Sequence, residues 1–347
     1  MPLPSLFIET LNGQASSPPP IWLMRQAGRY LPEYRKVRQE ANGFLDLCYT
    51  PDLAVEVTLQ PIRRYGFDAA ILFSDILVVP DALGCNVTFV EGEGPKLETF
   101  RDGAAVARLS KAGMHDHLAP VYETLRRLRK ELPEETALIG FAGAPWTVAS
   151  YMVEGGGSKE FQEARKFARL DPEGFSALID IVTEATTDYL LAQVEAGAEV
   201  LQLFDSWAGV LPPAQFHLWC ERPLKAIVSA VKNVHPDVPI IAFPRGAGPL
   251  YRRFIDTVPV DGVSLDTTVP PEWAVENLEK VCLQGNLDPI ALLSGGEDML
   301  NDARHLLNRL HGRPHIFNLG HGVLPPTDPD TVSRLVDFVR SHRPSSD

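Results

Sequence analysis

The chain has 347 residues, 45% of them hydrophobic, so it can bury the core of one large domain or two ordinary ones. Its formal net charge of −13 excludes general binding to nucleic acid or to anionic membranes, so an anionic ligand would need a local cationic pocket. The sequence opens with no secretion signal, and no apolar run is long enough to span a bilayer. We therefore expect a cytoplasmic protein that binds neither nucleic acid nor membrane.

The cysteines indicate no metal and no disulfide framework. Cys48, Cys85, Cys220 and Cys282 are scattered, without a CxxC pair or a His-x-Cys motif. Structural zinc sites and disulfide scaffolds both need grouped cysteines. We predict four reduced thiols.

The stretch 21–38, IWLMRQAGRYLPEYRKVR, is the most distinctive part of the chain. It begins with an apolar run that predicts a strand over 21–26 and continues as a cationic loop. Arginine offers a planar fork of donors that suits carboxylates and phosphates. Several arginines in one loop indicate either a polyanion binder or a basic turn that only faces water. The arginines of this stretch are Arg25, Arg29, Arg35 and Arg38.

The rest of the chain alternates short apolar runs with longer helical patterns. Thr50 and Pro51 mark a helix start, and apolar residues at three- and four-residue spacing predict a helix over 115–131. Residues 85–100 alternate around a Glu-Gly-Glu-Gly turn, which predicts an inserted hairpin. The glycine run in 151–158 predicts a loop, and it lacks the spacing of a nucleotide motif. Further helices are predicted over 171–196, 214–233 and 250–257.

Eight βα units in succession predict the fold. Continuous apolar strands followed by helices are typical of a parallel sheet covered by helices, and a count of eight favours closure into a TIM barrel. No linker divides the chain, so we predict a single (β/α)8 TIM-barrel catalytic domain over 1–347, with a β-hairpin insertion after strand 2. A doubly wound open sheet is the alternative. The strands are predicted over 21–26, 69–75, 137–143, 200–206, 239–245, 262–266, 281–287 and 315–320.

In such a barrel the active site lies at the carboxyl ends of the strands. Strands one, two and eight adjoin, so Arg25, Asp75 and His321 would face one pocket. Asp75 sits within a hydrophobic run, where a carboxylate needs a defined partner. His321 lies between two glycines, and a backbone-bonded hinge and a ligand contact are equally compatible with that. The polar residues at the strand ends are Arg25, Gln26, Ser74, Asp75, Trp146, Tyr151, Asp205, Ser206, Arg245, Asp266, Asn286, Asp288, Asn318 and His321.

Two of these carboxylates have a simpler explanation. Asp266 precedes two threonines and Asp288 precedes a proline, so we interpret both as caps of the following helix. Ser206 lacks a GxSxG elbow, which argues against a nucleophile.

Motifs spread over nearly the whole chain resemble those of the uroporphyrinogen decarboxylase family, and the first of them is highly specific. The resemblance implies a TIM-barrel homodimer in tetrapyrrole (haem) synthesis. It would remove CO₂ from the four acetates of uroporphyrinogen III to give coproporphyrinogen III, without cofactor or metal. The motifs are MRQAGRYLPEYR over 24–35, ILFSDIL over 71–77, GAPWT over 143–147, YMVEGGGS over 151–158, QLFDS over 202–206, QGNLDP over 284–289 and NLGHG over 318–322.

The resemblance also implies the site residues. Asp75 would accept the pyrrole N–H groups, and arginines would hold the acetates and propionates. The proton donor stays open among Arg25, Tyr151 and His321, because arginine is a reluctant acid. The implied catalytic residues are Asp75, Arg25, Tyr151 and His321, and the implied substrate contacts are Arg25, Gln26, Arg29, Arg38, Asp75, Tyr151, Phe204, Ser206 and His321.

The chemistry is consistent with these residues. Loss of CO₂ from an acetate leaves an electron pair, which most decarboxylases store in a cofactor. The sequence holds no clear motif for one, whereas a protonated pyrrole can accept the pair itself. Two alternatives stay open: a zinc-dependent methyltransferase, which would need a Cys/His ligand set, and a porphyrinogen carrier without activity.

Overall fold

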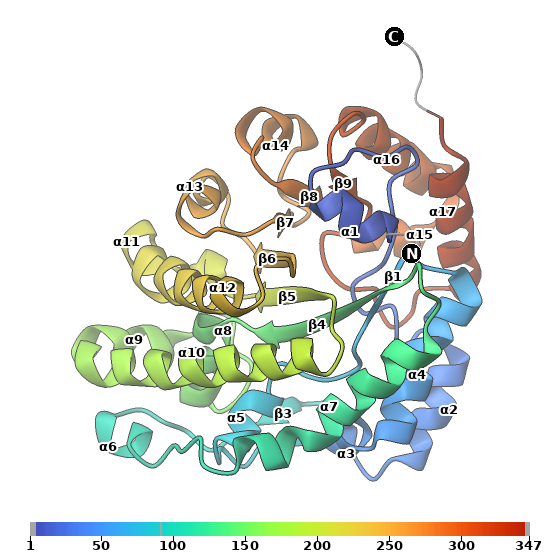
Figure 1. Cartoon of the computed structure of the whole chain (residues 1–347). Helices are drawn as coiled ribbons and strands as arrows, with labels where there is room; N and C mark the ends of the chain where they lie inside the picture. The colour runs from blue at the N-terminus through green and yellow to red at the C-terminus, as the bar shows by residue number, and fades with distance from the viewer. Residues whose placement is uncertain (1–4, 91, 344–347) are drawn as a thin grey trace.

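The computed structural model describes residues 5–90 and 92–343. Its main sheet has seven parallel strands in the order β1-β4-β5-β6-β7-β8-β9, and helices lie around the outside of the curled sheet (Figure 1). This arrangement is α/β and TIM-barrel-like. The strands are β1 (Ala69–Ile71), β4 (Ala137–Gly143), β5 (Val200–Asp205), β6 (Ile240–Pro244), β7 (Gly262–Ser264), β8 (Cys282–Gln284) and β9 (His315–Ile316).

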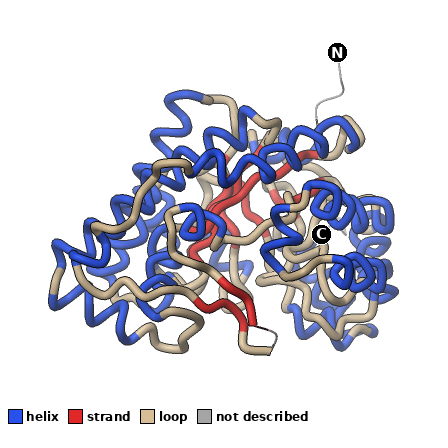
Figure 2. Tube along the Cα trace, turned by 90° about the horizontal axis from the view of Figure 1, so that it is seen from below, coloured by secondary structure: helices blue, strands red, loops and turns tan. Residues whose placement is uncertain are grey.

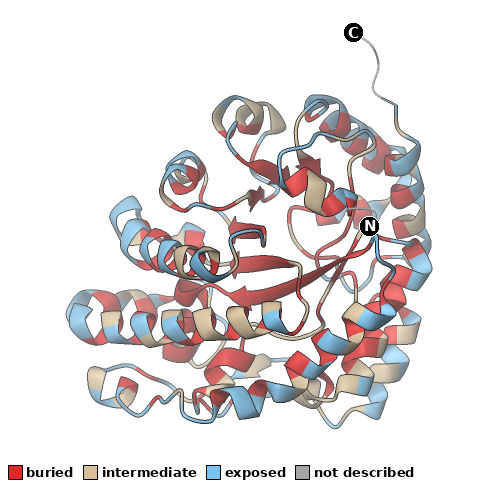
Figure 3. Ribbon diagram, in the orientation of Figure 1, coloured by how far each residue is buried: buried red, intermediate tan, exposed pale blue. Residues whose placement is uncertain are grey.

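The helices cover the sheet with their apolar faces. Figure 3 shows buried faces turned inward and exposed faces turned to solvent. The α-helices are α1 (Leu6–Leu11), α2 (Pro32–Glu40), α3 (Phe44–Tyr49), α4 (Pro51–Tyr65), α5 (Val78–Ala82), α6 (Gly103–Val106), α7 (Met114–Glu131), α8 (Pro145–Glu154), α9 (Gln162–Leu170), α10 (Pro172–Glu195), α11 (Pro213–Phe216), α12 (Arg222–Val234), α13 (Leu250–Thr257), α14 (Pro271–Asn277), α15 (Pro289–Ser294), α16 (Gly296–Arg309) and α17 (Pro329–Ser341).

Most predicted helices are confirmed within a residue or two, including those at α7, α10 and α13. The helix predicted over 214–233 is interrupted, because a π-helical turn, η2 (His217–Glu221), separates α11 from α12. A short 3₁₀ turn, η1 (Ala208–Val210), follows β5. No helix in the described ranges is both long and apolar enough to cross a membrane.

The strands of the main sheet are buried along their whole lengths, except for Ile71 at the end of β1, which is partly buried. All seven residues of β4 are buried, and Ile139 to Gly143 pair in register with Val200 to Phe204 of β5. A parallel sheet covered on its faces needs such continuous apolar strands. The rule that predicted these strands therefore reflects their actual environment.

The strand predicted over 21–26 is not formed. Only Ile21 makes a β-bridge, to Phe317, and its carbonyl accepts a hydrogen bond from Asp68 N at 3.0 Å. The segment thus bonds to residues beside both edges of the sheet, β9 and β1, without becoming a strand. Its ladder ends because Met24 N donates to the Asn318 side chain at 2.9 Å and the chain then turns at Arg25.

The predicted hairpin after the second strand is present. β2 (Thr88–Val90) and β3 (Gly94–Lys96) pair antiparallel, and Figure 2 shows them apart from the central sheet. Glu91, in the turn, lies outside the described residues. Past the hairpin, Leu97 N donates to Gly155 O at 3.1 Å and Phe100 N to Met152 O at 3.0 Å. The insertion therefore braces the carboxyl end of α8.

The sheet encloses a buried polar network instead of a purely apolar core. Gln284 of β8 accepts from Trp22 Nε1 at 2.8 Å and donates to Gln202 Oε1 at 3.2 Å. It also donates to Ser264 Oγ of β7, which accepts from Gln202 Nε2 at 3.3 Å. These bonds join the segment after Pro20 to three strands across the interior. Buried polar groups left without partners are costly, so the network specifies how these elements pack.

Removing the hub of this network tests its contribution. Gln284→Ala leaves the Trp22 indole N–H and Ser264 with fewer partners, so we expect the free energy of unfolding to fall by about 3 kcal/mol. Urea denaturation of this variant and of the exposed control Gln39→Ala measures the difference. Equal unfolding free energies for the two variants would show that the network adds nothing.

Candidate active site

Asp75 lies just beyond the carboxyl end of β1, where the chain leaves the sheet and turns into α5. The turn is held by the carboxylate itself, since Asp75 Oδ1 accepts a hydrogen bond from Leu77 N at 2.9 Å. In residues 5–90 and 92–343 this carboxylate makes no other hydrogen bond and no ion pair, so Oδ2 is available to a ligand. Burial raises the pKa of Asp75 to about 6, against the opposing charge of Arg25.

Arg25 faces Asp75 from the segment that joins the two edges of the sheet. Its backbone is left-handed, with φ 62°, which costs energy for a residue other than glycine and re-aims the side chain. The stem lies on Gly322, where an added Cβ would stand 2.3 Å from Arg25 Cδ. The residue as a whole is exposed, yet partial burial of its guanidinium lowers the pKa of Arg25, while the charge of Asp75 raises it. Arg25 is therefore held over the strand ends, open to a ligand.

Gln26 does not share this exposure. It is 1% exposed, its Oε1 accepts from Leu23 N at 3.2 Å, and its Nε2 donates to Ala69 O at 3.1 Å. Its carbonyl accepts from Tyr30 OH at 2.8 Å. The structure thus disfavours the predicted substrate contact. Gln26 shapes the turn that presents Arg25.

Tyr151 lies on α8, not in the loop predicted over 151–158. Pro145 starts this helix, and Gly155 ends it in a left-handed conformation, so the glycine run begins only after the last helical residue. The phenol is partly buried beside Trp207, with the ring centroids 6.5 Å apart. Burial raises its pKa, and the charges of Asp75 and Arg25 act on it in opposite directions. Tyr151 therefore faces the same space as these two residues.

Phe204 and Ser206 occupy the carboxyl end of β5. Phe204 is 9% exposed and meets Phe141 edge-on, with centroids 5.6 Å apart. Ser206 is partly buried and precedes Trp207. The backbone N–H of Trp207 donates to Thr147 Oγ1 at 3.2 Å. The same threonine donates to the buried Asp205 at 2.6 Å. The first turn of α8 thus fixes the loop that carries Ser206.

His321 closes the ring of candidate residues. Its Nδ1 accepts from Gly322 N at 2.7 Å, so the neutral imidazole carries its proton on Nε2. Burial lowers the pKa of His321 to about 4, and the charges of Arg25 and Arg245 add to this effect. At neutral pH His321 is therefore uncharged and can donate one hydrogen bond. The backbone bond, one of the two possibilities left open by the sequence, is confirmed, and within the described residues Nε2 makes no hydrogen bond.

The arginines of the first motif divide into two kinds. Arg35 donates to the carbonyls of Arg29 and Tyr30, so it supports the turn. Arg38 is partly buried, and both its charge and that of Asp75 act on the Cys48 thiol, which places it on the Asp75 side. Among the described residues, neither Arg25, Arg29 nor Arg38 forms an ion pair.

Of the two carboxylates interpreted as helix caps, Asp288 is confirmed, whereas Asp266 is not a cap, because the next helix, α14, begins after Pro270 without a side-chain cap. Asp288 Oδ1 accepts from Ile290 N at 2.9 Å at the start of α15. Asp266 accepts from Gly246 N, Thr268 N and the Tyr251 hydroxyl, and so ties three segments together. All four cysteines are free and buried, as predicted. Within the described ranges no group of three or more His, Cys, Asp or Glu side chains is arranged to hold a metal ion.

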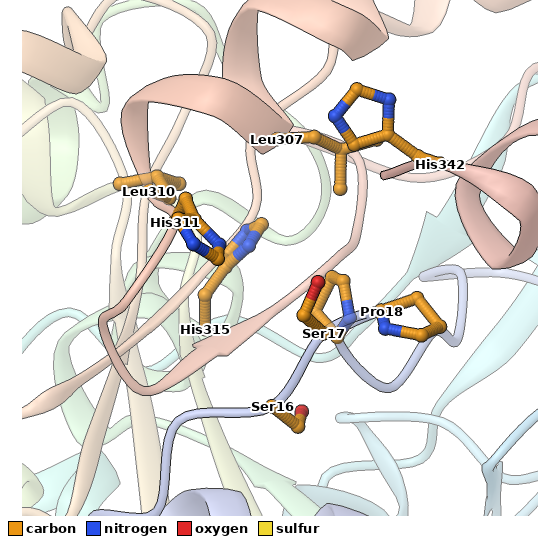
Figure 4. Close-up of a pocket in the computed structure, with 9 residues that line it drawn as sticks. Ser16, Ser17, Pro18, Leu307, Leu310, His311, His315 and His342 are labelled. Atoms are coloured by element: carbon orange, nitrogen blue, oxygen red, sulfur yellow. The ribbon is translucent and has the colours of Figure 1, made fainter. Parts of the chain in front are cut away.

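A pocket at the opposite end of the sheet has a different character. It is lined by Ser16, His311, His315 and His342, among others (Figure 4). His315, at the start of β9, donates from Nε2 to Gly285 O at 2.9 Å, and His342 bonds to the Asn308 side chain at 2.8 Å. His315 and His342 are thus engaged by the protein, and the pocket lies away from the candidate residues at the carboxyl ends of the strands.

The strand ends thus combine one carboxylate with a free oxygen, several arginines without carboxylate partners, and two neutral hydrogen-bond donors. A carboxylate in a low-dielectric site stabilises a nearby cation strongly. The arginines can bind carboxylates. The arrangement suits a ligand that carries negative groups on its rim and develops positive charge at its centre.

The raised pKa of Asp75 makes stability depend on pH. The pKa is about 6 in the fold and 3.8 for the ordinary side chain, so the stability linked to protonation is present below 3.8 and is lost as pH rises through 6. Asp75→Asn should therefore raise Tm at pH 8 and raise it much less at pH 4. Calorimetry beside the exposed control Asp337→Asn measures this, and an equal gain at both pH values would refute the burial effect.

The comparisons with known proteins agree with one another. The model of the family "Uroporphyrinogen decarboxylase (URO-D)" matches residues 3–342. The uroporphyrinogen decarboxylase of Rhodospirillum rubrum is 56% identical over 338 residues, 97% of each chain, and that of Paracoccus denitrificans is 55% identical, over 96% of this chain and 98% of the other. A methyltransferase from Methanosarcina mazei shares the fold, with a TM-score of 0.77 at 19% identity over 97% of this chain and 98% of that one. The chain belongs to the uroporphyrinogen decarboxylase family.

Proposed function

We propose that this protein decarboxylates uroporphyrinogen III, converting its four acetate side chains to methyl groups and releasing coproporphyrinogen III in tetrapyrrole synthesis. Family membership supports the reaction. The observation that carries the proposal is Asp75, a partly buried carboxylate with one free oxygen, which faces an arginine.

The reaction requires an electron sink, and the substrate supplies one. Protonation of a pyrrole ring carbon makes the ring an iminium. The bond from the acetate CH₂ to its carboxylate then breaks, CO₂ leaves, and the electron pair passes into the ring. A proton added to the exocyclic carbon, with loss of the ring proton, gives the methyl group. Each round therefore consumes one proton and releases one CO₂.

The chain's own residues match these demands. Asp75 accepts the pyrrole N–H groups through Oδ2 and stabilises the cationic ring, more strongly because water is partly excluded. Arg25, Arg29 and Arg38 bind carboxylates of the rim. Phe204 and Ser206 form part of the wall. The charge of a bound polyanion would also raise the low pKa of His321.

The proton donor belongs to the group of Arg25, Tyr151 and His321, since the charge of Arg25 acts on both Tyr151 and His321. None is a strong acid in the free protein: the pKa of Tyr151 is raised, and His321 is neutral at pH 7. The negative charge of a bound substrate with several carboxylates changes the pKa of His321 more than that of the other two residues. We therefore leave the donor open among the three.

The finer features of the architecture belong to the same proposal. We propose one catalytic domain over residues 1–347, a closed (β/α)8 barrel, a homodimer and a cytoplasmic location. The bonds from Ile21 and Trp22 to Asp68 and Phe317 support closure. The single continuous core of buried side chains supports one domain.

Turnover is tested with reduced substrate and the variant Asp75→Asn. The amide keeps the size of the carboxylate but not its charge, so we expect kcat to fall by at least about 100-fold, as for removal of a preorganised electrostatic group. Partially decarboxylated intermediates are separated by chromatography after incubation without added cofactor.

Exposed Asp337→Asn serves as the matched control and should retain full activity. If the wild-type protein returns uroporphyrinogen unchanged, it is a carrier and not an enzyme. An unchanged rate for Asp75→Asn would instead retire only the role of this carboxylate.

The binding role of the first arginine motif predicts a separation of KM from kcat. Arg29→Ala removes a charged donor that we place on a substrate carboxylate, so KM should rise about tenfold or more while kcat changes little. The neighbouring exposed Lys36→Ala removes the same charge and should leave KM unchanged. A normal KM for Arg29→Ala would contradict the contact.

A further inference from the structure

Arg245 follows the last residue of β6, across the sheet from the first arginine motif. β6 is the middle strand of seven, whereas Arg25 lies on the segment that contacts both edge strands. In a curled sheet these two positions are opposite. Arg245 therefore approaches the strand ends from the side that Arg25 and Arg29 do not cover.

The backbone of Arg245 is rigidly held. Its N–H donates to Asp205 O at 3.1 Å, and its carbonyl accepts from Gly209 N at 3.0 Å. The segments that carry Gly209 and Gly246 approach so closely that a Cβ on Gly209 would stand 2.7 Å from Gly246 O. Gly246 N in turn donates to Asp266 at 2.8 Å. The position at which the side chain leaves the strand is thus fixed from three directions.

The guanidinium of Arg245 has no protein acceptor in the described part of the chain, since it makes neither a hydrogen bond nor an ion pair there. The carboxylate beneath it, Asp266, already accepts from Gly246, Thr268 and Tyr251. The guanidinium lies 6.0 Å from the centre of the Trp207 ring, and its charge acts on both Arg25 and His321. An arginine whose charge acts on a second arginine, and which has no carboxylate partner among the described residues, indicates an anionic ligand.

We propose that Arg245 is a second carboxylate-binding point, opposite Arg25 and Arg29, which grips the far rim of the macrocycle; this inference rests on the function proposed above. Uroporphyrinogen carries eight carboxylates around its rim, so a one-sided clamp would let the ring tilt over Asp75. Grips on two opposite sides keep the pyrrole N–H groups centred on the carboxylate. Arg245 is thus a binding and positioning residue.

The test uses Arg245→Gln and the conservative Arg245→Lys, with Arg252→Gln on α13 as the control of equal charge. Binding of coproporphyrinogen III, kept reduced under argon, is measured by fluorescence at two salt concentrations, beside KM and kcat for uroporphyrinogen III. We expect Arg245→Gln to weaken binding or raise KM about 10- to 100-fold and to reduce the salt dependence. Arg245→Lys should recover part of the loss, and Arg252→Gln should behave as wild type.

Comparing the two macrocycles identifies which carboxylate, a propionate or an acetate, Arg245 binds. Weakened binding of coproporphyrinogen assigns Arg245 to a propionate, since the product has lost its acetates, whereas a raised KM with normal product binding assigns it to an acetate. Values for both Arg245 variants equal to those of Arg252→Gln would overturn the proposal. If the wild type releases no CO₂ but Arg245→Gln still weakens coproporphyrinogen binding, the proposed reaction fails while this site stands. If the wild type binds neither macrocycle, both fail.

Discussion

The site depends on the carboxylate of Asp75, of which only one oxygen accepts a hydrogen bond from the described part of the protein. Oδ1 of Asp75 accepts a hydrogen bond within its own turn, and Oδ2 has no hydrogen-bond partner among the described residues, just beyond the carboxyl end of β1. Burial destabilises the ionised form of Asp75 and thereby raises its pKa. A cationic ring placed over this oxygen would stabilise the ionised carboxylate. The carboxylate would in turn stabilise the positive charge of the ring.

The rest of the site is arranged around that carboxylate by short, specific contacts. Gln26 and Asn318 hold the turn that exposes Arg25, while Gly322 makes room for its stem. Thr147, on α8, fixes the loop after β5, and the same helix carries Tyr151. Residues of the scaffold thus determine where Arg25, Tyr151 and Ser206 stand relative to one another.

Sequence patterns predicted the parts of the molecule whose cause is local. The strand over 137–143 and the helix over 250–257 were predicted with the observed bounds, because burial and helical period are written in neighbouring residues. Residues 21–26 look like a strand, but Asn318, almost three hundred positions away, takes the hydrogen bond that a strand would use. Tyr151 was predicted in a loop because the glycines that follow it end a helix.

The candidate residues also divide into those that the sequence could place and those that depend on distant parts of the chain. The prediction that Arg25, Asp75 and His321 face one pocket is consistent with the charge of Asp75 acting on Arg25 and that of Arg25 acting on His321. Arg245 was predicted at a strand end, but only the structure reveals that its guanidinium has no hydrogen-bond or ion-pair partner among residues 5–90 and 92–343. The most direct test of the whole account is a crystal structure with coproporphyrinogen bound. The account predicts Asp75 Oδ2 within about 3 Å of the pyrrole nitrogens, and a macrocycle seated away from Asp75 would contradict it.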